Sequence, residues 1–143
     1  MIFTTKNEEE FKDKVWKAIE PKLKPGLVLG VIGDLGAGKT TLVKHIAQNL
    51  GFKGRVSSPT FVMRKTYSAK NNKGIKTIEH IDLYRLQRPL SRDIQEVKEW
   101  LEGKDSLVLI EWADLLGNKK YLNCIVKIKI KSSDEREVEI LWN

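Results

Sequence analysis

The sequence predicts an α/β fold in three layers, with a mixed central sheet flanked by helices. Residues 27–32 and 106–110 are continuous apolar runs, as in parallel strands that are buried on both faces. Near the C-terminus, apolar and charged residues alternate through 126–130 and 138–142, which is typical of antiparallel strands. A length of 143 residues suits one hydrophobic core, so we expect residues 1–143 to form a single domain.

The N-terminal half of the sequence predicts two helices, one before and one after the first buried strand. Apolar side chains recur at helical spacing within residues 4–21, behind Asn7 and Glu10, which resemble a capping box, and a proline ends this segment. A second apolar stripe over 42–50 predicts a helix that ends at Gly51, a natural C-cap.

The second half predicts a hairpin, a helix and three more strands. Residues 61–67 and 75–81 have strand character and are joined by a turn-rich segment. A helix is expected over 91–101, followed by the buried strand at 106–110. We expect the two alternating segments near the C-terminus to pair as antiparallel edge strands.

Composition limits the classes of protein that this chain can be. Cys124 is the only cysteine, which excludes an intramolecular disulfide, and its apolar surroundings in the sequence indicate a buried hydrophobe rather than a reactive thiol. No apolar run is long enough to cross a bilayer, and the N-terminus lacks a targeting pattern. We therefore expect a cytoplasmic protein without a membrane partner.

Positive charge is concentrated in residues 51–78. The net charge is +7, and this segment contains no acidic residue. It carries Lys53, Arg55, Arg64, Lys65, Lys70, Lys73 and Lys76. Two interpretations stay open: a solvated hairpin of a lysine-rich protein, or a docking surface for RNA, including tRNA, or for an acidic protein face.

Residues 33–40 match the pattern GxxxxGK followed by Ser or Thr, between a predicted strand and a predicted helix. The backbone N–H groups of such a turn and the positive end of the helix converge on a phosphate. Lys39 would bridge the β- and γ-phosphates, Thr40 would give its hydroxyl to Mg²⁺, and Thr41 would lie near the α-phosphate. The residues expected to hold ATP or ADP here are Leu35, Gly36, Ala37, Gly38, Lys39, Thr40 and Thr41. The alternative is a tight turn that only resembles this motif.

Two carboxylates follow predicted strands, where a P-loop needs an acidic group to hold Mg²⁺ or to orient water. Glu111 follows the strand at 106–110, and Asp82 ends the strand at 75–81. Together with Lys39 they are the candidate catalytic residues, and which carboxylate orients water stays open. A helix cap or a surface ion pair is the alternative for each.

A short polar loop at 57–61 contains one proline and precedes the hairpin. Such a loop can order around a γ-phosphate and relax after hydrolysis, so Thr60 is the expected nucleotide sensor. A simple β-turn is the alternative. His80 lies two residues before Asp82, and we interpret it as a packed, hydrogen-bonded histidine.

Four motifs stand in order at 33–41, 58–61, 80–86 and 110–114. Together they resemble the bacterial tRNA threonylcarbamoyladenosine biosynthesis ATPases, the TsaE (YjeE) family, over nearly the whole chain. The resemblance implies a P-loop NTPase-like fold and a small ATPase that assists two partner proteins. The reaction it implies places threonylcarbamoyl on the adenosine beside the tRNA anticodon.

The resemblance also implies roles for single residues. Thr40 and Glu111 would be the magnesium ligands, Asp82 would be needed for hydrolysis, and Trp112 would lie close to the nucleotide. The sequence departs from the family where members often carry a threonine in the first helix, and again over residues 87–99.

Parts of the sequence are also compatible with two functions other than an ATPase. A small-molecule kinase would need an arginine-rich lid, for which 85–92 is the only candidate segment. An RNA-binding module would use the basic segment 51–78 and would not depend on Lys39. Because no arginine finger is identifiable, we expect weak hydrolysis by the protein alone.

Overall fold

The computed structural model describes residues 1–59, 63–86 and 91–143, with the backbone alone for 91–94. The helices are α1 (Glu8–Ile19), α2 (Lys39–Asn49) and α3 (Ser91–Trp100), with 3-10 turns η1 (Glu20–Lys22), η2 (Ala113–Leu116) and η3 (Lys119–Tyr121). The strands are β1 (Ile2–Thr5), β2 (Val28–Ile32), β3 (Arg64–Ser68), β4 (Thr77–Asp82), β5 (Ser106–Glu111), β6 (Cys124–Ile130) and β7 (Arg136–Trp142).

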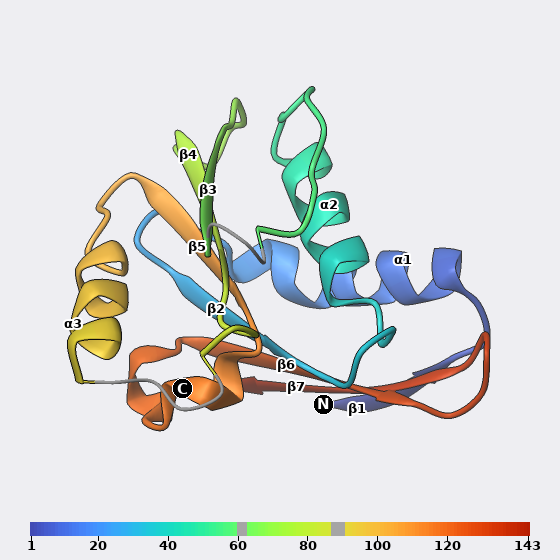
Figure 1. Cartoon of the computed structure of the whole chain (residues 1–143). Coiled ribbons are helices and arrows are strands. Elements are labelled where there is room, and N and C mark those ends of the chain that lie inside the picture. The colour runs from blue at the N-terminus through green and yellow to red at the C-terminus, as the bar shows by residue number, and fades with distance from the viewer. Residues whose placement is uncertain (60–62, 87–90) are drawn as a thin grey trace.

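One mixed sheet runs through the molecule in the order β1-β7-β6-β2-β5-β4-β3 (Figure 1). The four strands β6, β2, β5 and β4 are parallel to one another. Antiparallel strands complete both sides, with β7 and β1 beyond β6, and β3 beyond β4. The predicted α/β fold with a mixed central sheet flanked by helices is confirmed.

Helices cover both faces of the sheet, as alternating side chains of the strands require. Leu29 and Val31 of β2 belong to the core under α1 and α2, which contribute Val15 and Ile46 among others. Val28, on the opposite face of the same strand, packs in a second core that includes residues of α3 and η2. The parallel strands are therefore buried from both sides, which explains their uninterrupted apolar sequences.

The first helix begins where its capping residues predict. The side chain of Asn7 accepts a hydrogen bond from the backbone N–H of Glu10 at 2.8 Å. The Glu10 carboxylate instead accepts from the backbone of Lys6 at 3.2 Å, so the reciprocal half of the capping box is shifted by one residue. The α-helix ends at Ile19, two residues before Pro21, as the proline predicts, and the chain continues into the 3-10 turn η1, which contains that proline.

One expectation about the C-terminal strands is wrong. They pair with each other as predicted, but neither is an edge strand, because β6 also pairs with β2 and β7 also pairs with β1. The N-terminal strand β1 pairs with the C-terminal strand β7. The local alternation of apolar and charged residues cannot reveal a pairing between opposite ends of the sequence. Cys124, at the start of β6, is fully buried as predicted, and burial raises the pKa of its thiol to about 12.

The hairpin strands are displaced from their expected limits. β4 begins at Thr77 rather than residue 75, because the side chain of Asn71 bonds the backbone N–H and carbonyl of Ile75 and holds it in the turn. β3 is described from Arg64, and residues 61 and 62 lie outside the described part of the chain.

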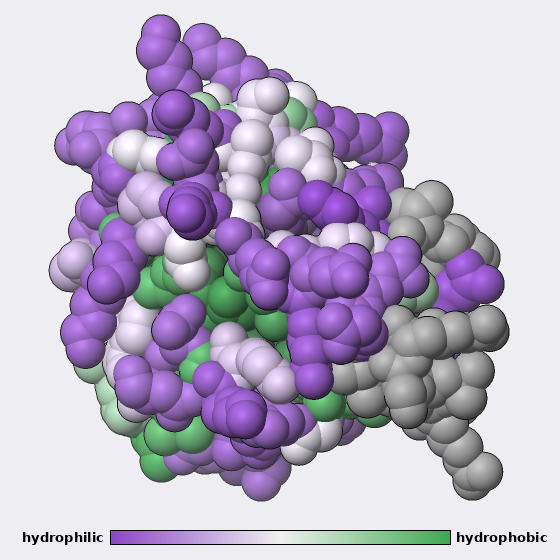
Figure 2. Space-filling model, turned by 90° about the vertical axis from the view of Figure 1, so that its left-hand side faces the viewer, coloured by the Kyte–Doolittle hydropathy of each residue, from purple (hydrophilic) through white to green (hydrophobic). Residues whose placement is uncertain are grey.

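The described helices include none that could cross a bilayer by length and apolar character together. Figure 2 shows one face of the molecule, on which hydrophilic side chains predominate around a smaller apolar hollow.

Candidate functional site

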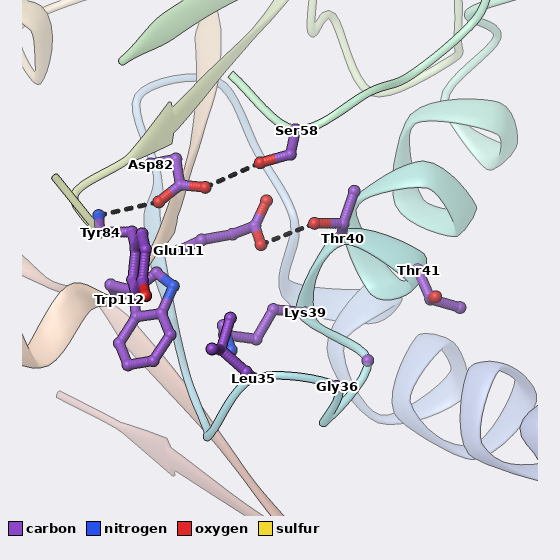
Figure 3. A pocket seen from close by; sticks show the side chains of 11 residues that line it. Leu35, Gly36, Lys39, Thr40, Thr41, Ser58, Asp82, Tyr84, Glu111 and Trp112 are labelled. Atoms are coloured by element: carbon purple, nitrogen blue, oxygen red, sulfur yellow. Dashed lines mark hydrogen bonds between the residues drawn. The ribbon is translucent and has the colours of Figure 1, made fainter. Parts of the chain in front are cut away.

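One pocket forms where the P-loop meets the ends of two strands (Figure 3). Its volume is about 330 Å³. It is lined by Leu35, Gly36, Gly38, Lys39, Thr40, Thr41, Ser58, Asp82, Tyr84, Glu111 and Trp112. Because β2, β4 and β5 are parallel, their carboxyl ends meet at one edge of the sheet, where ligands of open α/β sheets bind.

Backbone geometry explains the glycines of the P-loop. A Cβ at Gly33 would lie 2.8 Å from the carbonyl oxygen of Ile128, so a side chain there would collide with β6. Gly38 has φ +112, a conformation that residues with side chains rarely adopt, and it is the N-cap of α2. The turn is therefore set to direct backbone N–H groups and the helix N-terminus toward the same point.

Lys39 is folded back over the loop that carries it. Its Nζ donates to the carbonyl oxygens of Gly33 at 2.6 Å and Asp34 at 2.8 Å, and lies 4.2 Å from the ring centre of Trp112. The residue is only 5% exposed. Burial lowers the pKa of Lys39, and the nearby carboxylates, Glu111 first, act in the opposite direction. The ammonium therefore lies at the wall of the pocket, bonded to two carbonyl oxygens that phosphate oxygens would be able to replace as acceptors.

Glu111 joins the P-loop helix to the hairpin through buried hydrogen bonds. The hydroxyl of Thr40 donates to its Oε1 at 2.8 Å. Its other oxygen, Oε2, lies 2.5 Å from Nε2 of His80, and both side chains are almost completely buried. On the far side of the imidazole, Nδ1 lies 3.0 Å from the hydroxyl of Tyr67, which also donates to the carbonyl of Ser57 at 3.2 Å.

This network makes His80 the buried, hydrogen-bonded residue that the sequence suggests, and it adds two residues that the sequence did not. Nothing in the spacing of Tyr67 or Ser57 indicates a link to Glu111, because the strands β3, β4 and β5 bring them together from separate parts of the chain. The carboxylate is thus held at a fixed orientation on one side and faces Thr40 on the other.

Asp82 lies beside Glu111, in register with it on the adjacent strand. Its side chain is 2% exposed. Oδ2 accepts a hydrogen bond from the hydroxyl of Ser58 at 2.9 Å, and Oδ1 accepts from the backbone N–H of Tyr84 at 2.9 Å (Figure 3). The loop that the sequence singled out at 57–61 therefore reaches a site carboxylate through Ser58. Thr60, the expected sensor, lies outside the described residues.

Trp112 lines the pocket in an uncommon backbone conformation. Its φ is +58, in the left-handed region, and its ring lies 5.0 Å from that of Tyr84. For a bulky residue this conformation costs on the order of 1 kcal/mol, and such strain concentrates at functional sites. The turn into η2 places the indole against Lys39 and beside the P-loop.

The other residues expected to contact the nucleotide do not all line the same pocket. Leu35 is 67% exposed at the mouth of the pocket, whereas Ala37 is buried behind the loop and lines a neighbouring hollow. Thr41 borders both spaces. The described residues include no cluster of three or more His, Cys, Asp or Glu side chains that could hold a metal ion. A divalent cation here would have Thr40 and Glu111 as its protein ligands.

The basic segment 51–78 is partly neutralised by acids from elsewhere in the chain. Arg64 pairs with Glu79 at 2.9 Å, and Lys73 pairs with Glu20 at 2.8 Å. Lys76 is near Asp105, and Lys65 donates to the hydroxyl of Ser57. The exposed cations that enter no ion pair with a described residue are Lys53, Arg55 and Lys70. The kinase lid suggested at 85–92 falls mostly on residues outside the described part or on undescribed side chains.

Comparison with known proteins gives one consistent group of relatives. The family model for "Threonylcarbamoyl adenosine biosynthesis protein TsaE" matches residues 5–140. The chain is 38% identical over 135 residues to the tRNA threonylcarbamoyladenosine biosynthesis protein TsaE of Bacillus subtilis (strain 168), covering 94% of this chain and 80% of that protein. The TsaE protein of Rickettsia felis is 41% identical over 141 residues, covering 96% and 77%.

A solved structure agrees with these relatives. The fold is similar to the crystal structure of YdiB from Bacillus subtilis, with a TM-score of 0.69 and 34% sequence identity. The likeness covers 96% of this chain and 82% of that one. Sequence and fold therefore agree over almost the full length of the chain.

Proposed function

The chain belongs to the TsaE family of threonylcarbamoyl adenosine biosynthesis proteins, and on that premise we propose that it is a magnesium-dependent ATPase of low intrinsic activity. The role of the family lies in threonylcarbamoyladenosine biosynthesis for tRNA. In this proposal the protein binds ATP and assists two partner proteins, in the cytoplasm, in modifying the adenosine beside the tRNA anticodon.

One observation carries the proposal: the hydroxyl of Thr40 meets Oε1 of Glu111 at 2.8 Å, directly beside the P-loop and Lys39. A hydroxyl and a carboxylate are hard oxygen ligands, the kind that Mg²⁺ prefers. Two protein ligands suffice, since Mg²⁺ usually takes its others from phosphate oxygens and water. The donor set therefore fits magnesium bound together with a nucleotide, and when bound the ion would neutralise phosphate charge.

The other groups around the pocket would have separate roles. The P-loop N–H groups, Lys39 and Thr41 bind and orient the phosphates. Trp112 covers one side of the pocket and limits the access of water. The carboxylate of Asp82 is oriented by the hydroxyl of Ser58 and the backbone N–H of Tyr84, and in this proposal it would orient the attacking water.

The residues that line the pocket support the proposal of low intrinsic activity. The described lining residues include no arginine, the side chain that most strongly stabilises the charge of a phosphoryl-transfer transition state. A partner protein that supplies such a group, or that repositions the loop at Ser57 and Ser58, would accelerate hydrolysis. The partial neutralisation of the basic segment favours the ATPase over the RNA-binding module as the primary function.

The test is ATP hydrolysis by the chain alone and with its two presumed partners, beside a calorimetric titration with ATP and Mg²⁺. We expect binding, turnover well below about one per second for the chain alone, and a large stimulation by the partners. Absence of binding heat and of any thermal shift with ATP and Mg²⁺ would contradict the proposal. A rapid turnover without partners would contradict its dependence on them.

A further inference from the structure

Arg136, the first residue of β7, connects the turn after β6 to the P-loop. Its Nε donates to the carbonyl oxygen of Ala37 at 2.9 Å, and its Nη2 donates to that of Gly36 at 3.1 Å. The third nitrogen, Nη1, donates to carbonyl oxygens of its own turn, those of Ser132 at 2.9 Å, Ser133 at 3.3 Å and Glu135 at 3.0 Å. One guanidinium therefore joins two backbone segments that lie about a hundred residues apart.

These bonds act on the part of the loop that a phosphate must meet. In a trans peptide the C=O and the following N–H point in opposite directions. Fixing the carbonyl of Ala37 toward Arg136 therefore directs the N–H of Gly38 the opposite way within the same peptide plane. Fixing the carbonyl of Gly36 does the same for the N–H of Ala37, which closes the turn onto the carbonyl of Asp34 at 3.0 Å.

A glycine-rich loop needs such an external restraint. Gly36 and Gly38 both have positive φ, and glycine loses more conformational entropy on ordering than any other residue. Because Gly36 has no heavy atom within 4 Å of where a Cβ would be, packing does not hold it from that side. The planar fork of an arginine holds two adjacent carbonyls through two separate nitrogens in a fixed geometry and leaves the third nitrogen for the neighbouring turn, whereas a lysine offers a single nitrogen.

We infer that Arg136 is a positioning residue that keeps the P-loop in its anion-binding conformation, before any nucleotide arrives. The inference rests on the proposed function, since it assigns the loop to phosphate. Each of the three guanidinium nitrogens already donates to a backbone carbonyl, so Arg136 acts through the loop and is not a transition-state arginine.

The test compares Arg136→Ala and Arg136→Lys with Lys131→Ala. Lys131 is an exposed cation of the same turn, and its nearest ion-pair partner is Glu137 at 3.9 Å. The first measurement is amide hydrogen exchange of residues 33–41 without nucleotide, with amides of β2 and β5 as the internal reference. We expect exchange in the P-loop to be at least about tenfold faster in Arg136→Ala and unchanged in Lys131→Ala.

The second measurement is the affinity for ATP with Mg²⁺ and the turnover at saturating ATP. We expect affinity to fall about tenfold in Arg136→Ala and about fivefold in Arg136→Lys, which keeps the charge, with turnover at saturation within about twofold of the unmodified protein. If Arg136→Ala does not fold, Arg136→Lys carries both measurements.

Unchanged P-loop exchange in the Arg136 variants would overturn the inference, even if affinity falls, because the arginine would then act on the nucleotide directly. An equal loss of affinity in Lys131→Ala would also overturn it, since charge alone would explain the effect. If the unmodified protein fails to bind ATP, the proposed function fails, while the exchange measurement still decides whether Arg136 holds the loop.

Discussion

The two walls of the pocket hold their polar groups in different ways. The P-loop wall is built from consecutive residues, and its contacts are made by backbone groups, with Lys39 and Arg136 bonded to its carbonyls. The opposite wall is built from side chains that converge from separate strands, with Glu111 and Asp82 held by buried hydrogen bonds. In the proposed function, the backbone turn would bind the same phosphate groups throughout the reaction, whereas the oriented carboxylates would act on the positions of metal and water.

This difference predicts how the two walls respond to mutation. Loss of a contact made equally in the ground state and the transition state weakens binding and leaves turnover at saturation unchanged. Loss of an orienting group lowers turnover more than affinity. The P-loop wall should therefore control nucleotide affinity, and the carboxylate wall should control hydrolysis.

The largest effect is expected from Lys39→Ala on the P-loop wall. It removes the buried ammonium that, in the proposed function, would exchange its two carbonyl contacts for phosphate oxygens, so ATP affinity should fall at least about a hundredfold, or about 3 kcal/mol. Calorimetric titration with ATP and Mg²⁺ measures this. Lys44→Ala, an exposed lysine on the same helix, is the control and should bind normally. Tight binding by Lys39→Ala would remove the P-loop wall from the comparison.

The next largest effect is expected on the carboxylate wall. Asp82→Asn and Glu111→Gln should each lower turnover by about a hundredfold, because the amide that replaces each carboxylate is a weaker ligand and acceptor, while ATP affinity changes by less than about fivefold. Hydrolysis and binding are measured on the same preparations, with the exposed Glu102→Gln as the control. Full magnesium-dependent activity in Glu111→Gln would refute the role assigned to it.

A smaller effect is expected from Tyr67→Phe, which tests whether the carboxylate wall depends on its buried support. The change removes the hydroxyl that bonds His80 and the carbonyl of Ser57. We expect turnover to fall about three- to tenfold and unfolding free energy to fall by about 1 kcal/mol, with ATP affinity unchanged. Tyr121→Phe is the control, because Tyr121 lies in η3 and its ring contacts Lys98 and Lys120 instead of this network. Unchanged turnover with lowered stability would limit Tyr67 to a structural role.

The smallest effect on ATP binding and hydrolysis is expected away from both walls, at the exposed cations of the basic segment. If tRNA contacts this segment, Lys53→Glu with Arg55→Glu should weaken tRNA binding about tenfold at low salt and should reduce its salt dependence, with ATP affinity unchanged. Filter binding over a salt series measures this, with Lys104→Glu as a control. Identical salt curves would exclude a contact through these two residues.

The same difference explains what could be predicted from sequence. The P-loop is contiguous, so residues 33–41 are recognisable without any fold. Asp82 and Glu111 could be proposed because a charge at the end of an apolar strand is unusual. Their supporting partners could not, because Tyr67 and Ser57 approach them only after the strands pair.

Long-range pairing also accounts for the other differences. The C-terminal strands were expected at an edge, but β1 (Ile2–Thr5) pairs with β7 from the opposite end of the sequence. Arg136 lacks any sequence signal, because its partners in the P-loop lie 99 and 100 positions away. Thr60 is a residue that the structure does not describe, so its role as a nucleotide sensor stays a prediction.

Cys124 has a practical consequence, since its strand lies between β2 and β7 in the interior of the sheet. Alkylating reagents attack the thiolate, and a pKa of about 12 leaves almost none of it at neutral pH. Alkylation of Cys124 therefore requires the sheet to open. The only thiol of the chain is a natural reporter of global opening, and slower labelling with a ligand present would measure how strongly that ligand protects the whole fold.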